Sequence, residues 1–185
     1  MSNMQLDTLR RIVQEINASV SLHDSLDIMV NHVAEAMHVD VCSIYLLDER
    51  NKRYVLMASK GLKPEAVGHV SLNVGEGLVG LVGKREEIVN LDNAPKHERF
   101  AYLPETGEEL FNSFLGVPVM YRRKVMGVLV VQNQEPQDFS EAAESFLVTL
   151  CAQLSGVIAH AHAVGNIDVF RKPTSGSSYK TFQGV

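Results

Sequence analysis

The chain has 185 residues, 45% of them hydrophobic and 21% charged, which is the size and composition of one folded domain and excludes a disordered or collagen-like polymer. Its formal net charge is −5, whereas a nucleic-acid-binding domain carries a basic stripe. Two cysteines are too few for a disulfide framework, and the sequence shows neither a secretory signal nor a membrane-length apolar run. We therefore expect a cytoplasmic protein without nucleic-acid or membrane partners.

Two amphipathic helices are predicted at the start of the chain. Apolar residues recur at helical spacing over residues 4–19 and again from Leu22 to Met37. Ser21 precedes the second helix and Asp24 follows three residues later, so Ser21 is predicted to cap that helix. Both apolar stripes need a surface against which to bury.

The middle of the chain changes to a strand pattern. Strands are predicted at 41–47, 53–59, 69–72, 88–91, 113–121 and 125–133, with a short helix at about 78–85. The first and the last two of these strands are apolar on both faces, which indicates a sheet that is covered on both sides. We expect the two N-terminal helices and the C-terminal helix on one face, and the segment 75–112 on the other.

A long helix is predicted from Ser140, its N-cap, to about Val164. Its apolar residues follow steps of four and three, the pattern of a heptad seam: Ala143, Leu147, Leu150, Leu154, Val157 and Ala161. The seam looks too wide for one sheet edge to cover, so we expect a homodimer through helix 140–164 and the first helix. Residues 165–185 are rich in Gly, Ser, Lys and Pro and are predicted to be a flexible linker into a further domain, so the folded domain is expected to span 1–164.

The order of elements and four local strings resemble the GAF domain, the small-molecule-sensing module of the PAS/GAF superfold. The strings are Val41–Asp48, Gly75–Gly80, Phe114–Val119 and Met126–Val131. The resemblance covers about residues 4–164 and implies an α/β (α+β) fold with a central, mostly antiparallel sheet of about six strands. Within the GAF family, the strings Glu76–Gly83 and Glu144–Leu150 are most similar to the N-terminal sensory segment of the nitrogen-related phosphoenolpyruvate–protein phosphotransferases.

This resemblance implies a regulatory function. The domain would bind a nitrogen-status metabolite, glutamine or 2-oxoglutarate by family analogy, and modulate a downstream phosphotransferase domain that takes a phosphoryl group onto a histidine. We expect no catalytic residue, cofactor or metal site in this chain itself. The positions that line the family's ligand pocket correspond here to Ser43, Tyr45, Ser59, Leu78, Val79, Asp92, His97, Phe100, Thr106, Phe111 and Val130.

The residues themselves also favour a pocket. Residues 92–112, which we call the covering segment, are polar and aromatic without a clear period, as expected of a lid. Ser43 lies in the middle of an apolar strand face, so its hydroxyl needs a partner: a backbone carbonyl, a water or a ligand. The cavity is predicted between the covering segment and the sheet face that carries Ser43, Ser59 and Val130.

Other functions remain open at this point. The fold could serve only as a dimerisation module without a ligand. Some GAF proteins reduce free methionine sulfoxide with loop cysteines, but neither Cys42 nor Cys151 lies in the covering segment. The motif Gly75-x-Gly77-x-x-Gly80 imitates a dinucleotide fingerprint, yet the helix after it is too short for a crossover, so a tight turn with close packing explains the glycines better.

Overall fold

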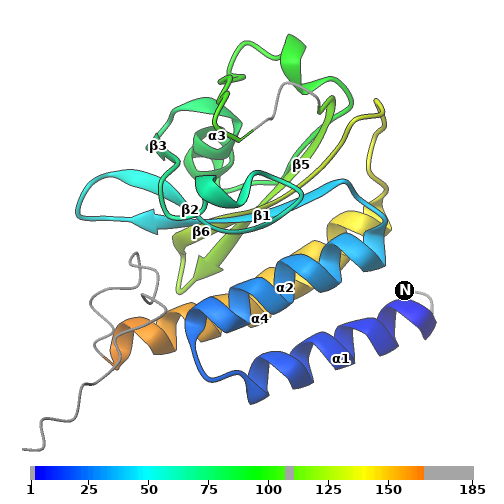
Figure 1. The fold of residues 1–185 in the computed structure, drawn as a ribbon, viewed down its shortest axis with the longest axis vertical. Coiled ribbons are helices and arrows are strands. Elements are labelled where there is room, and N and C mark those ends of the chain that lie inside the picture. Colours follow the sequence, from blue (N-terminus) through cyan, green and yellow to red (C-terminus); the bar gives the residue numbers. More distant parts are fainter. Residues whose placement is uncertain (1–2, 107–110, 165–185) are drawn as a thin grey trace, which may run out of the picture.

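A six-stranded antiparallel sheet forms the middle layer of the computed structural model, which describes residues 3–106 and 111–164 (Figure 1). The strands in chain order are β1 (Val41–Asp48), β2 (Arg53–Lys60), β3 (Ser71–Asn73), β4 (Val89–Leu91), β5 (Ser113–Tyr121) and β6 (Lys124–Asn133). Their order across the sheet is β3-β2-β1-β6-β5-β4, and every neighbouring pair is antiparallel. The predicted sheet is thereby confirmed.

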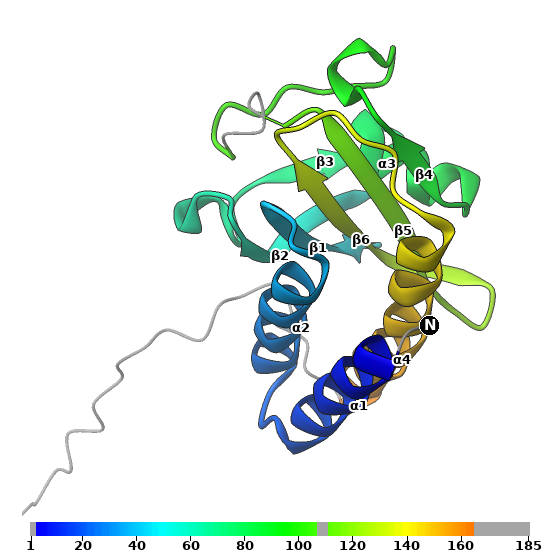
Figure 2. The ribbon, with the colours of Figure 1, turned by 90° about the vertical axis from the view of Figure 1, so that its right-hand side faces the viewer.

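Three helices cover one face of this sheet: α1 (Asn3–Ala18), α2 (Leu22–Met37) and α4 (Glu141–Ala163). α2 packs on β1 and β2, and α4 packs on β5 and β6. α1 lies outside both helices and contacts them from the side away from the sheet, as Figure 2 shows. This is the predicted arrangement of the helical layer. The predicted caps are confirmed too, because Ser21 accepts from the N–H of Asp24 at 3.1 Å and Ser140 from that of Ala143 at 3.2 Å.

The apolar seam predicted on the last helix is buried inside the chain. Leu147, Leu150 and Leu154 have no exposed surface and belong to the core between the helices and the sheet. The expectation that this seam needs a second copy of the chain to bury it was wrong, because α1 and α2 cover the part of α4 that the sheet leaves open. α4 also has the length and mean hydropathy (1.5) of a membrane span, and the burial of its apolar side explains that composition as well.

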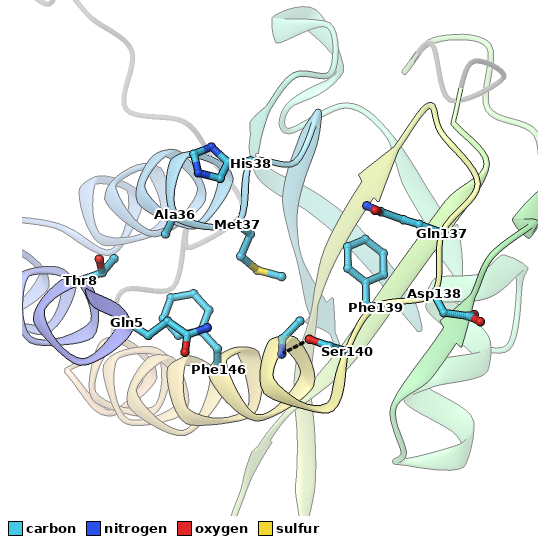
Figure 3. Close-up of a pocket in the computed structure, with 11 residues that line it drawn as sticks. Gln5, Thr8, Ala36, Met37, His38, Gln137, Asp138, Phe139, Ser140 and Phe146 are labelled. Atoms are coloured by element: carbon cyan, nitrogen blue, oxygen red, sulfur yellow. Dashed lines mark hydrogen bonds between the residues drawn. The ribbon is translucent and has the colours of Figure 1, made fainter. Parts of the chain in front are cut away.

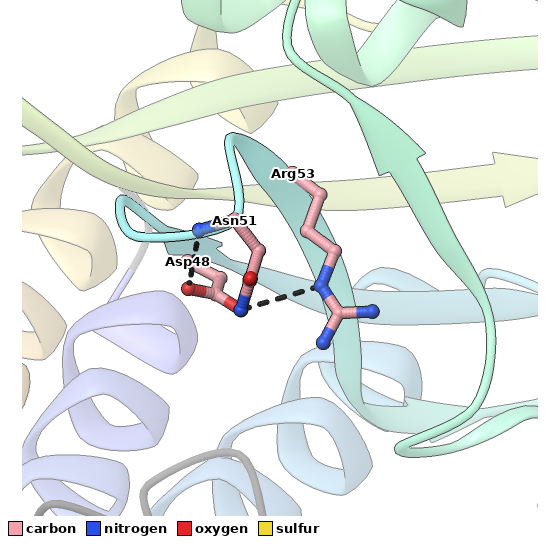
Figure 4. A network of polar contacts seen from close by, with 3 residues as sticks. All are labelled: Asp48, Asn51 and Arg53. Atoms are coloured by element: carbon pink, nitrogen blue, oxygen red, sulfur yellow. Dashed lines mark hydrogen bonds and ion pairs between the residues drawn. The ribbon is translucent and has the colours of Figure 1, made fainter.

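The turn between β1 and β2 is held by the carboxylate of Asp48 (Figure 4). It accepts hydrogen bonds from the backbone N–H of Asn51 (3.1 Å), the side-chain amide of Asn51 (2.7 Å) and Nε of Arg53 (3.2 Å). Burial by itself would raise the pKa of Asp48, but these hydrogen bonds outweigh it and hold the pKa below its usual value. The ionised carboxylate therefore stabilises the turn.

The other face of the sheet is covered by α3 (Gly77–Arg85), by the 3-10 turn η1 (Pro64–Ala66) and by the described part of the covering segment, residues 92–106 and 111–112, which includes the 3-10 turn η2 (Ala94–Lys96). The glycines before and within α3 have backbone roles, as expected. Gly75 and Gly77 have φ of +84° and +66°, and a Cβ on Gly80 would lie 2.6 Å from the backbone of Gly75. The predicted third strand, 69–72, is shifted: His69 and Val70 donate their N–H groups to the carbonyl of Ala66 and close a turn, so β3 begins later.

Candidate ligand site

A small cavity lies between the sheet and its cover. Its volume is about 20 Å³, and it is lined by Leu72, Gly77, Leu78, Val79, Phe100, Ala101, Phe114 and Gln132. A space of this size holds about one water molecule. A metabolite therefore does not fit into the cavity in this closed arrangement.

Three of the predicted site residues, Leu78, Val79 and Phe100, line this cavity. Three others, Tyr45, Phe111 and Val130, are buried in the same apolar cluster without lining it. The structure therefore brings the apolar part of the predicted set to one side of the sheet.

The two predicted serines satisfy each other. Ser43 on β1 stands opposite Ser59 on β2, and their hydroxyl groups are 2.9 Å apart. Ser43 is fully buried, so its hydroxyl needs a partner, and that partner is a protein side chain. The cavity lies further along the sheet, beside Phe114 and Gln132, and the sheet face over Ser43 does not line it.

The predicted residues His97 and Thr106 form hydrogen bonds within the covering segment. Nδ1 of His97 accepts from the backbone N–H of Arg99 at 3.1 Å, and the Thr106 hydroxyl donates to the carbonyl of Leu103 at 2.7 Å. Asp92 is exposed. These three predicted residues do not line the cavity.

Five cavity residues were absent from the predicted set, and Gln132 is the one with a polar side chain; the others are Leu72, Gly77, Ala101 and Phe114. Gln132 is only 4% exposed, and no described residue offers a hydrogen-bond donor to its Oε1. Its cross-strand neighbours are Phe114 on β5 and Val41 on β1, both buried and apolar. The available signal was a glutamine two residues after Val130, on the same face of an otherwise apolar strand.

The start of α3 borders the same cavity. The first N–H groups of a helix have no acceptor within the helix, and residues 77–79 at this end line the cavity. In the part of the chain that the structure describes, no side chain caps α3. The guanidinium of Arg99 donates to the carbonyl of Gly75, just before the helix. The cavity is therefore bordered by the side-chain amide of Gln132 and by the first turn of α3.

A much larger hollow, about 690 Å³, lies on the helical side of the sheet (Figure 3). It is an open groove between the start of α1, the end of α2 and the start of α4, with Met37, Phe139 and Phe146 among its lining residues. Another hollow, about 620 Å³, lies at the other end of these helices. Both are separated from the cavity by the sheet.

The two cysteines lie on the side of the sheet away from the cavity. Cys42 and Cys151 are buried in the core under the helices, and burial raises the pKa of both thiols, with the neighbouring Cys151 raising that of Cys42 further. A buried neutral thiol is a poor nucleophile. This geometry weighs against a reductase that acts through these cysteines. Over residues 3–106 and 111–164, no three His, Cys, Asp or Glu side chains cluster in a way that could hold a metal ion.

Comparison with known proteins gives consistent results. The family model of the GAF domain matches residues 21–158. A phosphoenolpyruvate-dependent phosphotransferase system protein of Salmonella typhimurium is 41% identical over 167 residues, which are 90% of this chain and 22% of the relative. The chain thus spans about a fifth of that protein's length.

Two solved structures are similar over nearly their whole length. The GAF domain from an Acinetobacter phosphoenolpyruvate-protein phosphotransferase is 84% identical, with a TM-score of 0.82, over 90% of this chain and 99% of that domain. The GAF domain from a phosphoenolpyruvate-protein phosphotransferase of Coxiella burnetii is 44% identical, with a TM-score of 0.85, over 89% of this chain and 99% of that domain.

Proposed function

The chain belongs to the GAF domain family, and we propose that it is the regulatory input domain of a cytoplasmic phosphoenolpyruvate–protein phosphotransferase of the nitrogen phosphotransferase system. The observation that carries the proposal is the 84% identity to the Acinetobacter domain over 99% of its length. In this function the domain binds a nitrogen-status metabolite, glutamine or 2-oxoglutarate by family analogy, and changes the rate of phosphoryl transfer in the domain that follows. Residues 165–185, which lie outside the described residues, would be the linker to that domain.

A ligand changes such an output only by binding two conformations unequally. The closed covering segment leaves about 20 Å³, so the closed form binds poorly and an opened form binds well. β4 leads directly into the covering segment, and its Asn90 is bonded to the start of α4. The Asn90 amide donates to the carbonyl of Phe139 and to Glu144, both at 2.8 Å, and its oxygen accepts from the N–H of Phe139 at 3.2 Å. These hydrogen bonds join the covering segment, through β4, to α4, so a movement of the segment can be transmitted to that helix.

The test uses the full-length protein and labelled phosphoenolpyruvate. We expect glutamine or 2-oxoglutarate to change the initial rate of histidine phosphorylation, and we expect a protein without residues 1–164 to lose this response while it remains phosphorylated. An identical response in both proteins would place the metabolite's action outside this domain and refute the proposal.

A purely structural role is the second candidate, because the nearly filled cavity is also what a domain without a ligand would have. We propose that the homodimer forms through the outward faces of α1 and α4, where Leu6 is 48% and Val148 44% exposed. Sedimentation equilibrium tests this interface. A parent chain that stays monomeric at high micromolar concentration would remove it.

A further inference from the structure

We propose that the basic end of the sheet docks on an acidic face of the phosphotransferase part of the protein that follows this domain. The basic end consists of the β1–β2 turn and the β5–β6 turn, and its exposed cations are Arg50, Lys52, Arg122, Arg123 and Lys124. The inference rests on the proposed function, because it takes from that function a phosphotransferase domain in the same polypeptide.

The two turns lie at one end of the sheet and concentrate positive charge there. β1 and β6 are antiparallel neighbours, and Leu46 near the end of β1 pairs with Gly127 near the start of β6, so both turns project from the same end. Residues 48–53 and 121–124 hold six cations against two carboxylates, a net charge of +4 in a chain whose net charge is −5. One of these carboxylates, Asp48, is already paired with Arg53 at 3.2 Å. Within residues 3–106 and 111–164, the five exposed cations form no ion pair.

The backbone of the two turns is unusual. Among the described residues, five that are not glycine have a positive φ. Two of these, His38 and Glu86, end helices, where this conformation is common. The other three are Lys52 (+54°), Arg122 (+48°) and Arg123 (+64°). All three lie in the two turns, and all three are basic.

The β5–β6 turn shows the strain most clearly. Tyr121 pairs with Lys124, so Arg122 and Arg123 form a two-residue turn in which both residues have a positive φ. This is a type I′ turn, which favours Asn-Gly and strains residues with longer side chains. Strain that persists on an exposed turn, where no packing requires it, indicates a function for the side chains. Arg122 also lies over the ring of Tyr121, with Cζ 5.3 Å from the ring centroid, and this contact orients its guanidinium.

The direction of α4 indicates what covers this end. Glu144 at the start of α4 is bonded to Asn90, whose strand partner is Leu115 near the start of β5. Further along, Cys151 contacts the carbonyl of Val117. α4 and β5 therefore run in the same direction, and Figure 1 shows the last turn of α4 on the side of the molecule where β6 begins. A domain that follows α4 is tethered close to the basic end, and tethering raises its effective concentration there.

The chemistry of the basic end fits a protein face rich in carboxylates. Guanidinium groups bind carboxylates through paired hydrogen bonds, and arginine and tyrosine are enriched in protein interfaces. Outside the two turns, eleven cations stand against twenty carboxylates, a net charge of −9. This charge repels a nucleic acid or an anionic membrane, whereas a single acidic face of a tethered domain reaches the basic end alone.

Arginine footprinting of the full-length protein tests this inference. Phenylglyoxal modifies accessible guanidinium groups, and mass spectrometry gives the rate at each arginine. At an effective concentration of about 1 mM, a docking dissociation constant of about 0.1 mM leaves roughly a tenth of the molecules undocked, so Arg122 and Arg123 should react about tenfold more slowly than in the isolated chain printed above. Arg10 and Arg11, exposed neighbours on α1, are the internal control and should react alike in both proteins. Salt at about 1 M should remove the protection, because it shortens the Debye length to about 3 Å.

A turn variant gives a second measurement. Arg122→Asn combined with Arg123→Gly introduces the sequence that a type I′ turn favours, so the isolated chain should unfold about 2–4 °C higher. The full-length variant should lose the docking and sediment more slowly than the parent, because a detached domain raises the frictional drag. Arg10→Gln combined with Arg11→Gln removes the same charge from α1 and should leave the sedimentation of the full-length protein unchanged.

The outcomes separate the inference from the proposed function. If Arg122 and Arg123 react equally fast in both proteins, the inference is overturned and the sensing function stands, because the footprint is taken without a metabolite. Protection that grows with protein concentration also overturns it, since the occupant is then a second copy of the chain. A full-length turn variant that sediments like the parent does the same. If the protection is found but the metabolite response does not depend on residues 1–164, the sensing function fails and the docking stands. The footprint needs no variant, so it decides even if the turn variant does not fold.

Discussion

Asn90→Ala should destabilise the domain through the loss of one side-chain amide that ties β4 to α4. The amide makes three hydrogen bonds, two with the backbone of Phe139 and one with the carboxylate of Glu144. A bond between neutral groups contributes about 1 kcal/mol, and one to a charged group about 1.5–3 kcal/mol. Because the site is partly exposed, water will replace part of what is lost, so we expect a decrease of about 2–3 kcal/mol in the free energy of unfolding.

Urea unfolding followed by circular dichroism measures this decrease. The matched control is Asn17→Ala on the exposed side of α1, which should change stability by less than about 0.5 kcal/mol. A double-mutant cycle of Asn90→Ala with Glu144→Ala should return a coupling of about 1 kcal/mol, which separates the hydrogen bond from the favourable position of Glu144 in the first turn of α4. A coupling within error of zero, or a loss in Asn90→Ala no larger than in the control, would refute the assigned connection between β4 and α4.

Three further predictions concern stability. The folded-state pKa of Asp48 is lowered, so its carboxylate stabilises the fold above the unfolded pKa of about 3.9 and loses this contribution as the pH falls through the folded value. The stability difference between the parent and Asp48→Asn should therefore shrink below about pH 4. A constant difference in urea titrations from pH 7 to pH 3 would contradict this. Gly83→Ala should destabilise the domain by about 1–3 kcal/mol although alanine favours a helix, because the new Cβ would meet the buried ring of Tyr54. Gly156→Ala, on the open surface of α4, should stabilise the domain by about 0.5–1 kcal/mol. Thermal melts that show the same sign for both variants would argue against this packing. Leu154→Ala should cost about 2–5 kcal/mol in urea unfolding, since Leu154 is fully buried and not at a dimer surface, and a loss below about 1 kcal/mol would place it at the surface.

Local signals in the sequence predicted the elements well, because they depend on neighbours along the chain. The caps Ser21 and Ser140 are short-range hydrogen bonds, and the period of the apolar residues is a property of each segment alone. The heptad seam shows the limit of such signals. Its spacing predicts a buried face on the last helix, but it does not say whether the cover is a second copy or, as found, the sheet with α1 and α2.

The pairing of the two serines required long-range information. Counting back from the β1–β2 turn, an unbroken ladder would put Ser43 opposite Ala58. The register shifts between Ile44 and Tyr45, and this moves Ser59 into the position opposite Ser43. No sequence pattern announces this irregularity, so the partner of the Ser43 hydroxyl could not be identified in advance. Gln132 was missed for a similar reason: its burial depends on α3 and the covering segment, which are distant in sequence.

The closed cavity limits how tightly this domain can bind a metabolite. When only a fraction of the molecules is open, the apparent dissociation constant rises by the inverse of that fraction, so an open population of about 1% weakens binding about 100-fold. The cavity beside Gln132 has room for about one water, so its Oε1 does not by itself favour the open form. The fraction of open molecules would therefore set the affinity of the domain for a metabolite.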